Sequence, residues 1–227
     1  VYDGFNKETV YSYTDANRSF TVKTPEGITV TTYKTRSGEI AKVTDDKGGS
    51  IKYQYNANGQ LKKVTDALNK VTIDNVYKEN GNLWKTTDAL GTVVELGYDA
   101  LNRVISRTVD PTGLNLKTTY EFNALGQQFR VTEAPGTVVE RVTEYTYDRK
   151  GQLSTVVTDP AGLMLQTTYT YDGAGNAVTV AKGTTTTPNQ QVIKYIFDKA
   201  GRRISEIVDP VNAQNLTGLN INTTYLY

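Results

Sequence analysis

The residues of this sequence best suited to chemistry are the carboxylates and amides that recur directly after tyrosine or phenylalanine. They stand at six positions: Asn56, Asp99, Asn123, Asp148, Asp172 and Asp198. Paired carboxylates perform acid–base work in glycosidases, and a ladder of carboxylates can bind calcium. A catalytic pair needs two unlike environments at one place, whereas these residues repeat one environment along the chain. We therefore interpret them first as turn residues that accept backbone N–H groups, with calcium binding as the alternative.

Other catalytic and metal-binding designs lack their key residues. The sequence has no histidine and no cysteine, which excludes Ser-His-Asp triads, zinc sites built on those residues and thiolate nucleophiles. Gly173 and Gly175 lie in a predicted hairpin turn and not between a strand and a helix, so they do not form a phosphate cradle. We predict no catalytic, cofactor-binding or metal-binding residue, and no enzymatic activity.

The acids and amides belong to a repeated block, Tyr-x-Tyr-Asp-x-x-Gly followed by Leu or Val. Phenylalanine replaces the second tyrosine in two copies, and Asn102 stands where another copy would have glycine. Successive copies of the turn residue are 21 to 26 residues apart. The residues assigned to this structural repeat are Tyr53, Tyr55, Gly59, Tyr98, Asp99, Tyr120, Gly126, Tyr145, Tyr147, Asp148, Gly151, Tyr169, Tyr171, Asp172, Gly175, Tyr195, Asp198 and Gly201.

Each block predicts a β-hairpin, because a period of roughly 20–25 residues holds two strands of about 5–8 residues and two turns. A second turn is marked by Asp66, Asp88, Asp110, Asp159 and Asp209. The two aromatic residues of a strand point to one face, and we expect them to align into ladders across neighbouring strands. The sequence predicts an all-β fold of consecutive antiparallel hairpins forming a curved, spiralling sheet, as in a segment of a shell or an open barrel-like strip.

Composition excludes two classes of partner. The 25 basic and 24 acidic side chains leave a formal charge of +1, so no global field attracts nucleic acid. No stretch approaches the roughly 18 consecutive apolar residues of a membrane helix, so we predict no membrane insertion. The 16 tyrosines, among many threonines and valines, are typical of half-buried strands. The absence of cysteine leaves the redox compartment open, and a secreted bacterial protein fits it.

The blocks Tyr147 to Leu153 and Tyr98 to Val104, each followed by an Asp-Pro-x-Gly segment, closely resemble the YD repeats of the rearrangement hotspot (RHS) family. That family includes the shell subunits of insecticidal toxin complexes, RHS effectors and the teneurins. The resemblance implies a β-sheet strip that spirals into a hollow shell around a toxic C-terminal region. It also implies that the partners are the remaining repeats of the same parent protein and an enclosed toxin or effector, in a bacterial protein that is secreted or at the cell surface.

The same resemblance sets the expected organisation of the chain. We expect residues 1–227 to be a single array of about nine to ten hairpins, truncated at both ends. Some twenty strands spaced about 4.8 Å apart would close into a ring only about 30 Å across, too narrow for a container. In the family an Asp-Pro-x-Gly-Leu segment supports self-cleavage of the cargo, but Asp110 to Leu114 and Asp159 to Leu163 stand at ordinary second-turn positions. We interpret both segments as turns.

A second hypothesis is a secreted or surface-exposed adhesion or carbohydrate-binding array, with glycans as partners. Trp84 could serve as a platform on which a sugar stacks, although packing against a neighbouring hairpin is the preferred interpretation. Basic residues near the first turns could meet anionic glycans or phosphate, although protection of sheet edges explains them more simply. They are Lys62, Lys63, Arg149, Lys150, Arg202 and Arg203.

Overall fold

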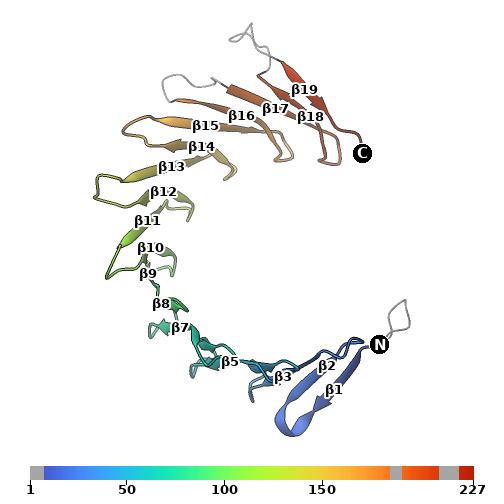
Figure 1. Ribbon diagram of the computed structural model, residues 1–227. Coiled ribbons are helices and arrows are strands. Elements are labelled where there is room, and N and C mark those ends of the chain that lie inside the picture. Colours follow the sequence, from blue (N-terminus) through green and yellow to red (C-terminus); the bar gives the residue numbers. More distant parts are fainter. Residues whose placement is uncertain (1–7, 185–190, 210–219) are drawn as a thin grey trace. The chain divides into compact units, whose positions relative to one another are not determined.

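The computed structural model describes residues 8–184, 191–209 and 220–227, and they form an all-β fold (Figure 1). The only helical element in these ranges is a 3-10 turn, Asp15–Asn17. The chain divides into two compact units, Val1–Leu116 and Lys117–Tyr227. In both units the described strands pair antiparallel with their neighbours in sequence, so the predicted fold class of consecutive hairpins is confirmed.

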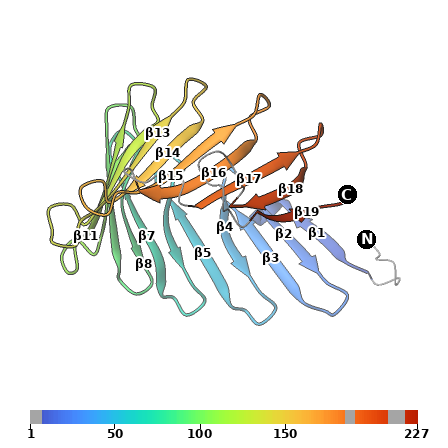
Figure 2. The same ribbon diagram turned by 90° about the horizontal axis from the view of Figure 1, so that it is seen from above.

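The first unit is a strip of ten strands. Their bounds are β1 Val10–Thr14, β2 Ser19–Lys23, β3 Thr29–Lys34, β4 Ile40–Thr44, β5 Ser50–Tyr55, β6 Leu61–Thr65, β7 Val71–Tyr77, β8 Leu83–Asp88, β9 Val93–Tyr98 and β10 Val104–Val109. Each strand pairs with the next one, from β1–β2 to β9–β10. The connecting turns therefore alternate between the two edges of the strip, as Figure 2 shows.

The second unit repeats this arrangement. Its strands are β11 Leu116–Phe122, β12 Gln128–Glu133, β13 Arg141–Tyr147, β14 Leu153–Thr158, β15 Leu165–Tyr171, β16 Ala177–Thr184, β17 Gln191–Phe197, β18 Arg203–Val208 and β19 Ile221–Thr224. Pairing again runs from each strand to the next. The boundary between the units falls at the start of β11, within the repeat pattern, so a single array over residues 1–227 stays a prediction.

The hairpins from β3–β4 to β17–β18 each contain a β-bulge just after the first turn, whereas β1–β2 pairs without a register shift. In the hairpin β13–β14, Thr146 pairs with Thr155 and Tyr147 pairs with Leu153, so Ser154 is the extra residue. A bulge of this kind leaves one residue unpaired and increases the local twist. Trp84 is the bulge residue of hairpin β7–β8, because Val76 pairs with Lys85 and Tyr77 with Leu83. Its side chain is 41% exposed.

The strips have almost no core. Among the described residues only three apolar side chains are buried: Val64, Ala181 and Val192. A single sheet without a covering layer cannot remove much apolar surface from water, so burial contributes little to its stability. Hydrogen bonds of the strand ladders and turns, together with cross-strand pairs, must contribute a correspondingly larger share.

The tyrosine ladder differs from the prediction. Tyr145 stands opposite Val156, and Tyr169 stands opposite Val180. Because each hairpin adds two strands, a return strand with no aromatic residue at the paired position separates these tyrosines from those of the next hairpin, and the rings do not meet. Tyr11 and Phe20, with centroids 5.9 Å apart, form the one aromatic ring pair within the described ranges. Several of the tyrosines instead donate their hydroxyl groups to backbone carbonyls of the preceding hairpin.

Candidate functional site: the joints between hairpins

Six of the first turns are built on one acid or amide, whereas Thr35 and Lys78 open two others. In the turn that joins β13 to β14, Asp148 Oδ1 accepts the backbone N–H groups of Lys150 and Gln152 at 2.8 and 2.9 Å. The Asp148 N–H donates to the carbonyl of Gln152, and the Gly151 N–H donates to the carbonyl of Asp148. The same acceptor geometry recurs at Asn56, Asp99, Asn123 and Asp198, and Asp172 accepts the N–H of Asn176. These side chains hold the backbone of the turns.

The Asp-Pro-x-Gly-Leu segments form a different turn. Asp110 and Asp159 have positive φ angles of 49° and 54°. In both segments the second carboxylate oxygen of the aspartate accepts the N–H of the leucine, Leu114 or Leu163, at 2.8 Å. Both segments connect one strand to the next at the second-turn position.

At six joints within the two units, a hydroxyl latch ties a strand to the preceding hairpin. The second tyrosine of a block donates its phenolic O–H to the backbone carbonyl of the residue that opens the return strand of the preceding hairpin. The donor–acceptor distances are 2.7–2.9 Å for Tyr55 to Ile40, Tyr77 to Leu61, Tyr98 to Leu83, Tyr147 to Gln128, Tyr171 to Leu153 and Tyr227 to Arg203. The latch lies beyond the last backbone-paired residues of the two neighbouring hairpins. It therefore connects strand ends that no backbone hydrogen bond of the sheet joins.

An amide latch reinforces some of the same joints at the turns. The side-chain amide of Gln60 donates to the carbonyl of Gly81, the turn glycine of the next hairpin, at 2.7 Å. Gln127 makes the equivalent bond to Gly151 at 3.3 Å. Neither latch was predicted from the sequence. The sequence does contain a signal for each: a tyrosine directly before the turn residue for the hydroxyl latch, and a glutamine directly after the turn glycine for the amide latch.

The joint between the hairpins β15–β16 and β17–β18 lacks the hydroxyl. Phe197 occupies the position of the latching tyrosine, and Ala177 opens the return strand of the preceding hairpin. Phe197 and Ala177 both line a groove of about 430 Å³ at this joint, together with Tyr195, Gly201 and Arg203. The joint is therefore held without the phenolic bond found at its neighbours.

We expect Phe197→Tyr to stabilise this joint. A neutral hydrogen bond contributes on the order of 1 kcal/mol to the free energy of unfolding, and the latching tyrosines show the required geometry at equivalent positions. Urea denaturation would measure the gain, and Phe197→Leu serves as a control that should give no gain. An unchanged or lowered free energy of unfolding in Phe197→Tyr would contradict the prediction.

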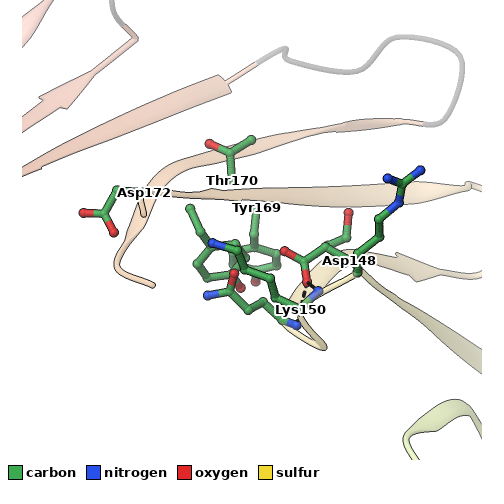
Figure 3. Close-up of a pocket in the computed structure, with 9 residues that line it drawn as sticks. Asp148, Lys150, Tyr169, Thr170 and Asp172 are labelled. Carbon is green, nitrogen blue, oxygen red and sulfur yellow. Dashed lines mark hydrogen bonds between the residues drawn. The ribbon is translucent and has the colours of Figure 1, made fainter. Parts of the chain in front are cut away.

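A groove of about 470 Å³ lies at the joint between the hairpins β13–β14 and β15–β16. Figure 3 shows Asp148 and Lys150 on the same side of β15 as the ring of Tyr169, while Thr170 points to the opposite side. The groove thus brings together four of the predicted repeat residues: Asp148, Tyr169, Tyr171 and Asp172. Its lining also includes Arg149, Lys150, Gln152, Ser154 and Thr170.

The pKa shifts of Asp172 and Tyr171 in this groove run against a role in proton transfer. The hydrogen bond from the Asn176 side chain and others from the turn backbone lower the pKa of Asp172. Desolvation raises the pKa of Tyr171 above its usual value, and its O–H is already committed to the Leu153 carbonyl. Asp172 therefore stays ionised and Tyr171 stays protonated near neutral pH, which is the opposite of what a general acid–base pair requires.

An equivalent groove of about 350 Å³ lies in the first unit and is lined by Asn56, Lys62, Asp74, Asn75, Val76 and Tyr77. Here Asn75 takes the place of Tyr169, and the turn carries Ala57 and Asn58 in place of Arg149 and Lys150. The joint groove is thus a repeated structural feature whose lining varies with the repeat.

The other predicted repeat residues are distributed along the array and do not form one cluster. Tyr53 stands opposite Val64, Tyr120 opposite Val131 and Tyr195 opposite Glu206. The first-turn glycines all have positive φ: Gly59, Gly126, Gly151, Gly175 and Gly201. Of the basic residues, Lys63 pairs with Asp74, Arg202 with Asp198 and Arg203 with Glu206.

The acids of the turns predict how stability depends on pH. Hydrogen bonds from the turn lower the pKa of Asp99, Asp172 and Asp198 below the ordinary value of 3.8. A carboxyl group with a lowered pKa in the folded state stabilises the fold fully above about pH 4, and this stabilisation is lost as pH falls through the folded-state pKa. Urea midpoints measured from pH 6 to pH 2 should therefore decline below pH 4.

Asp172→Asn is the matched control for this decline. Asparagine keeps the side-chain oxygen that accepts backbone N–H groups, as Asn56 and Asn123 do at equivalent positions. The variant should lose less stability than the parent between pH 4 and pH 2. An equal loss would show that Asp172 does not contribute to the acid sensitivity.

The described part of the chain offers neither a metal-binding cluster nor a membrane-spanning helix. No group of three or more acidic side chains that could hold a metal ion occurs there. No described helix is long and apolar enough to cross a membrane.

Comparison with solved structures gives likeness in fold. The crystal structure of TcdB2-TccC3-Cdc42 has a TM-score of 0.56 to this chain at 16% sequence identity, over 87% of this chain and 13% of that one. The crystal structure of TcdB2-TccC3 without its hypervariable C-terminal region has a TM-score of 0.55 at 16% identity, over 88% and 14%. This chain therefore spans only a small part of the chains it resembles. No curated protein matches the sequence.

The family comparison covers nearly the whole sequence. The family described as Teneurin YD-shell matches residues 2–217. The predicted resemblance to YD repeats is thereby confirmed, and a structural role as part of a YD shell follows from the family and from the fold. The chain belongs to the Teneurin YD-shell family.

Proposed function

We propose that this chain is a wall segment of a YD-type shell that encloses or displays a C-terminal toxin or effector, and that it is not an enzyme. The observation that carries the proposal is the hydroxyl latch, which recurs at five joints between described hairpins with the same donor and acceptor positions. A catalytic site consists of a unique arrangement of side chains at one position, whereas a wall built of repeats uses the same contact between hairpins many times. The repeat residues then act structurally, and the whole of residues 1–227 is one array.

The partners in this proposal are the remaining repeats of the same parent protein and the enclosed toxin or effector. The likeness to TcdB2-TccC3, a protein with a hypervariable C-terminal region, supports a variable cargo. The parent protein would be secreted or at the cell surface of a bacterium. Nucleic acid and membrane insertion have no part in it, and neither does a cofactor.

The test is protection of the cargo by the parent protein. The parent gene should encode many more hairpins and a variable C-terminal region. Limited proteolysis of the purified parent protein should leave that region uncut until the array is unfolded with urea. A parent protein whose C-terminal region is cut as quickly in the native state as in urea would contradict enclosure.

A second candidate function is carbohydrate binding by a surface-exposed array, and the groove beside Tyr169 is the observation that favours it. The Tyr169 ring, which lines this groove together with Gln152 and Ser154, could offer a face on which a sugar ring stacks, and the amide and hydroxyl groups could bond the sugar hydroxyls. A glycan array would test this function, with Tyr169→Ala as the variant that should lose binding. The absence of signal above background for the parent protein would eliminate it.

A further inference from the structure

The two rims of the first unit differ in character. The second turns, which join β6 to β7, β8 to β9 and β10 to the following strand, each place one leucine at the tip. These residues, here called the leucine rim, are Leu68, Leu90 and Leu114, and their side chains are 87%, 88% and 75% exposed. Turn tips accept any side chain that suits the loop, so nothing in the turn itself requires leucine. Large exposed apolar side chains in a row are typical of an interaction surface.

The three turns of the leucine rim are neighbours on one edge of the strip. Asp88, which opens the second of these turns, pairs with Ile73 of β7, just beyond the first. The Asp110 N–H of the third turn donates to the Val93 carbonyl, at the end of the second turn, at 2.7 Å. Each step along the rim crosses two strands, so the leucines stand about 9.6 Å apart.

The same rim is acidic. The four consecutive second turns from residue 45 to residue 114 contain five aspartates, Asp45, Asp46, Asp66, Asp88 and Asp110, against two lysines, Lys47 and Lys70. Acids still outnumber bases when Lys52, which donates to Asn69 Oδ1 at 3.0 Å, is included. The four first turns on the opposite rim, residues 35–39, 56–60, 78–82 and 99–103, carry three acids and three bases.

The spacing of the leucines and the acidic charge of the rim together indicate which kind of peptide it would bind. In an α-helix, residues seven apart lie on one face and about 10.5 Å apart, within about 1 Å of the step along the rim. An extended strand cannot supply such a row, because residues three apart point to opposite faces. Polyproline peptides have a similar pitch, but they dock on aromatic side chains, and these turns contain none. We propose that the leucine rim binds a basic amphipathic helix whose apolar residues repeat every seven positions.

Binding of a synthetic helix to the full chain tests the proposal. The probe is a fluorescently labelled 21-residue helix with leucine at heptad spacing and lysine elsewhere, measured by fluorescence anisotropy. We expect saturable binding with a dissociation constant on the order of 10 μM that weakens with salt. A helix with glutamate in place of lysine, and a proline-interrupted version of the basic helix, should bind at least tenfold more weakly.

The chain contains its own matched control. Asp66 to Asn69 and Asp99 to Asn102 have the same sequence, Asp-Ala-Leu-Asn, but lie on opposite rims. The double variant Leu68→Ser/Leu90→Ser should weaken binding at least tenfold, whereas Leu101→Ser, 72% exposed in the parent chain, should leave it within about twofold. Asp46→Lys, a change at a turn tip away from the leucines, should also weaken binding and reduce its salt dependence.

Several results would overturn the proposal. They are no saturable binding up to 200 μM, equal binding of the acidic helix or the proline-interrupted helix, and equal losses for Leu101→Ser and the double variant. Sedimentation would measure self-association of the chain, and vesicle flotation would measure its binding to lipid. If the leucine variants abolish self-association or lipid binding while helix binding is unchanged, the rim serves a second copy of the chain or a membrane instead.

Discussion

Tyr98→Ala is expected to lower the free energy of unfolding by about 3 kcal/mol, because it removes a half-buried aromatic ring and a latch at once. The Tyr98 O–H donates to the Leu83 carbonyl at 2.8 Å and joins the hairpin β9–β10 to the hairpin β7–β8. Desolvation raises the pKa of this phenol, in keeping with its partly buried position. Urea denaturation and hydrogen exchange of the β8 and β9 amides would measure the effect.

Tyr98→Phe separates the two contributions. It keeps the ring and removes only the hydroxyl, so it should lose about 1 kcal/mol. The described joint at Phe197 already lacks this hydroxyl, so a single loss is compatible with folding. If Tyr98→Phe were as damaging as Tyr98→Ala, the hydroxyl would dominate. If Tyr98→Phe left the free energy of unfolding unchanged, the hydrogen bond from Tyr98 to Leu83 would not contribute to stability.

Gly151→Val is expected to destabilise the second unit by about 2–3 kcal/mol. Gly151 has a φ of +82°, a conformation that β-branched residues adopt only under strain. A Cβ atom at this position would also stand 3.4 Å from the Gln127 side-chain nitrogen, which donates to the Gly151 carbonyl. The substitution therefore strains the turn and disturbs the amide latch together. The midpoint of urea denaturation provides the measurement.

Gly151→Asn is the matched control, because the chain already uses asparagine at this position of another repeat. Asn102 has a φ of +60° in the turn that Asp99 opens. Asparagine is among the residues that tolerate the left-handed region, so the loss should stay below about 1 kcal/mol. Equal losses for valine and asparagine would mean that contact with Gln127, and not backbone strain, sets the cost.

The large effects expected at Tyr98 and Gly151 have one physical origin: a sheet without a hydrophobic core depends on the hydrogen bonds of its joints and turns. A single sheet exposes both faces, and its described residues include only three buried apolar side chains. Stability must then come from many local hydrogen bonds, each contributing a small amount, as in other repeat proteins in which each unit contacts only its neighbours. Damage to one joint should accordingly loosen that joint first, which hydrogen exchange can resolve along the strip.

The local features of the fold could be predicted from the sequence. The recurrence of Asp148 and Gly151, and of their counterparts about every 24 residues, determines where the chain turns, because side-chain capping and positive φ are properties of a few adjacent residues. The alternation around Tyr169 determines which residues share a face. These relations extend over five residues or fewer, so no tertiary information is needed to infer them.

The contacts between hairpins were decided by the tertiary structure. The bulge at Ser154 shifts the register of its hairpin by one residue, and this shift depends on how two strands meet and not on either strand alone. That register brings the Tyr171 hydroxyl to the Leu153 carbonyl and places Val180, not another tyrosine, opposite Tyr169. The sequence by itself determined the repeat, its turns and its faces. Only the tertiary structure decided that the tyrosines act as latches, because a latch joins residues 15 to 24 positions apart across a register that local preferences do not encode.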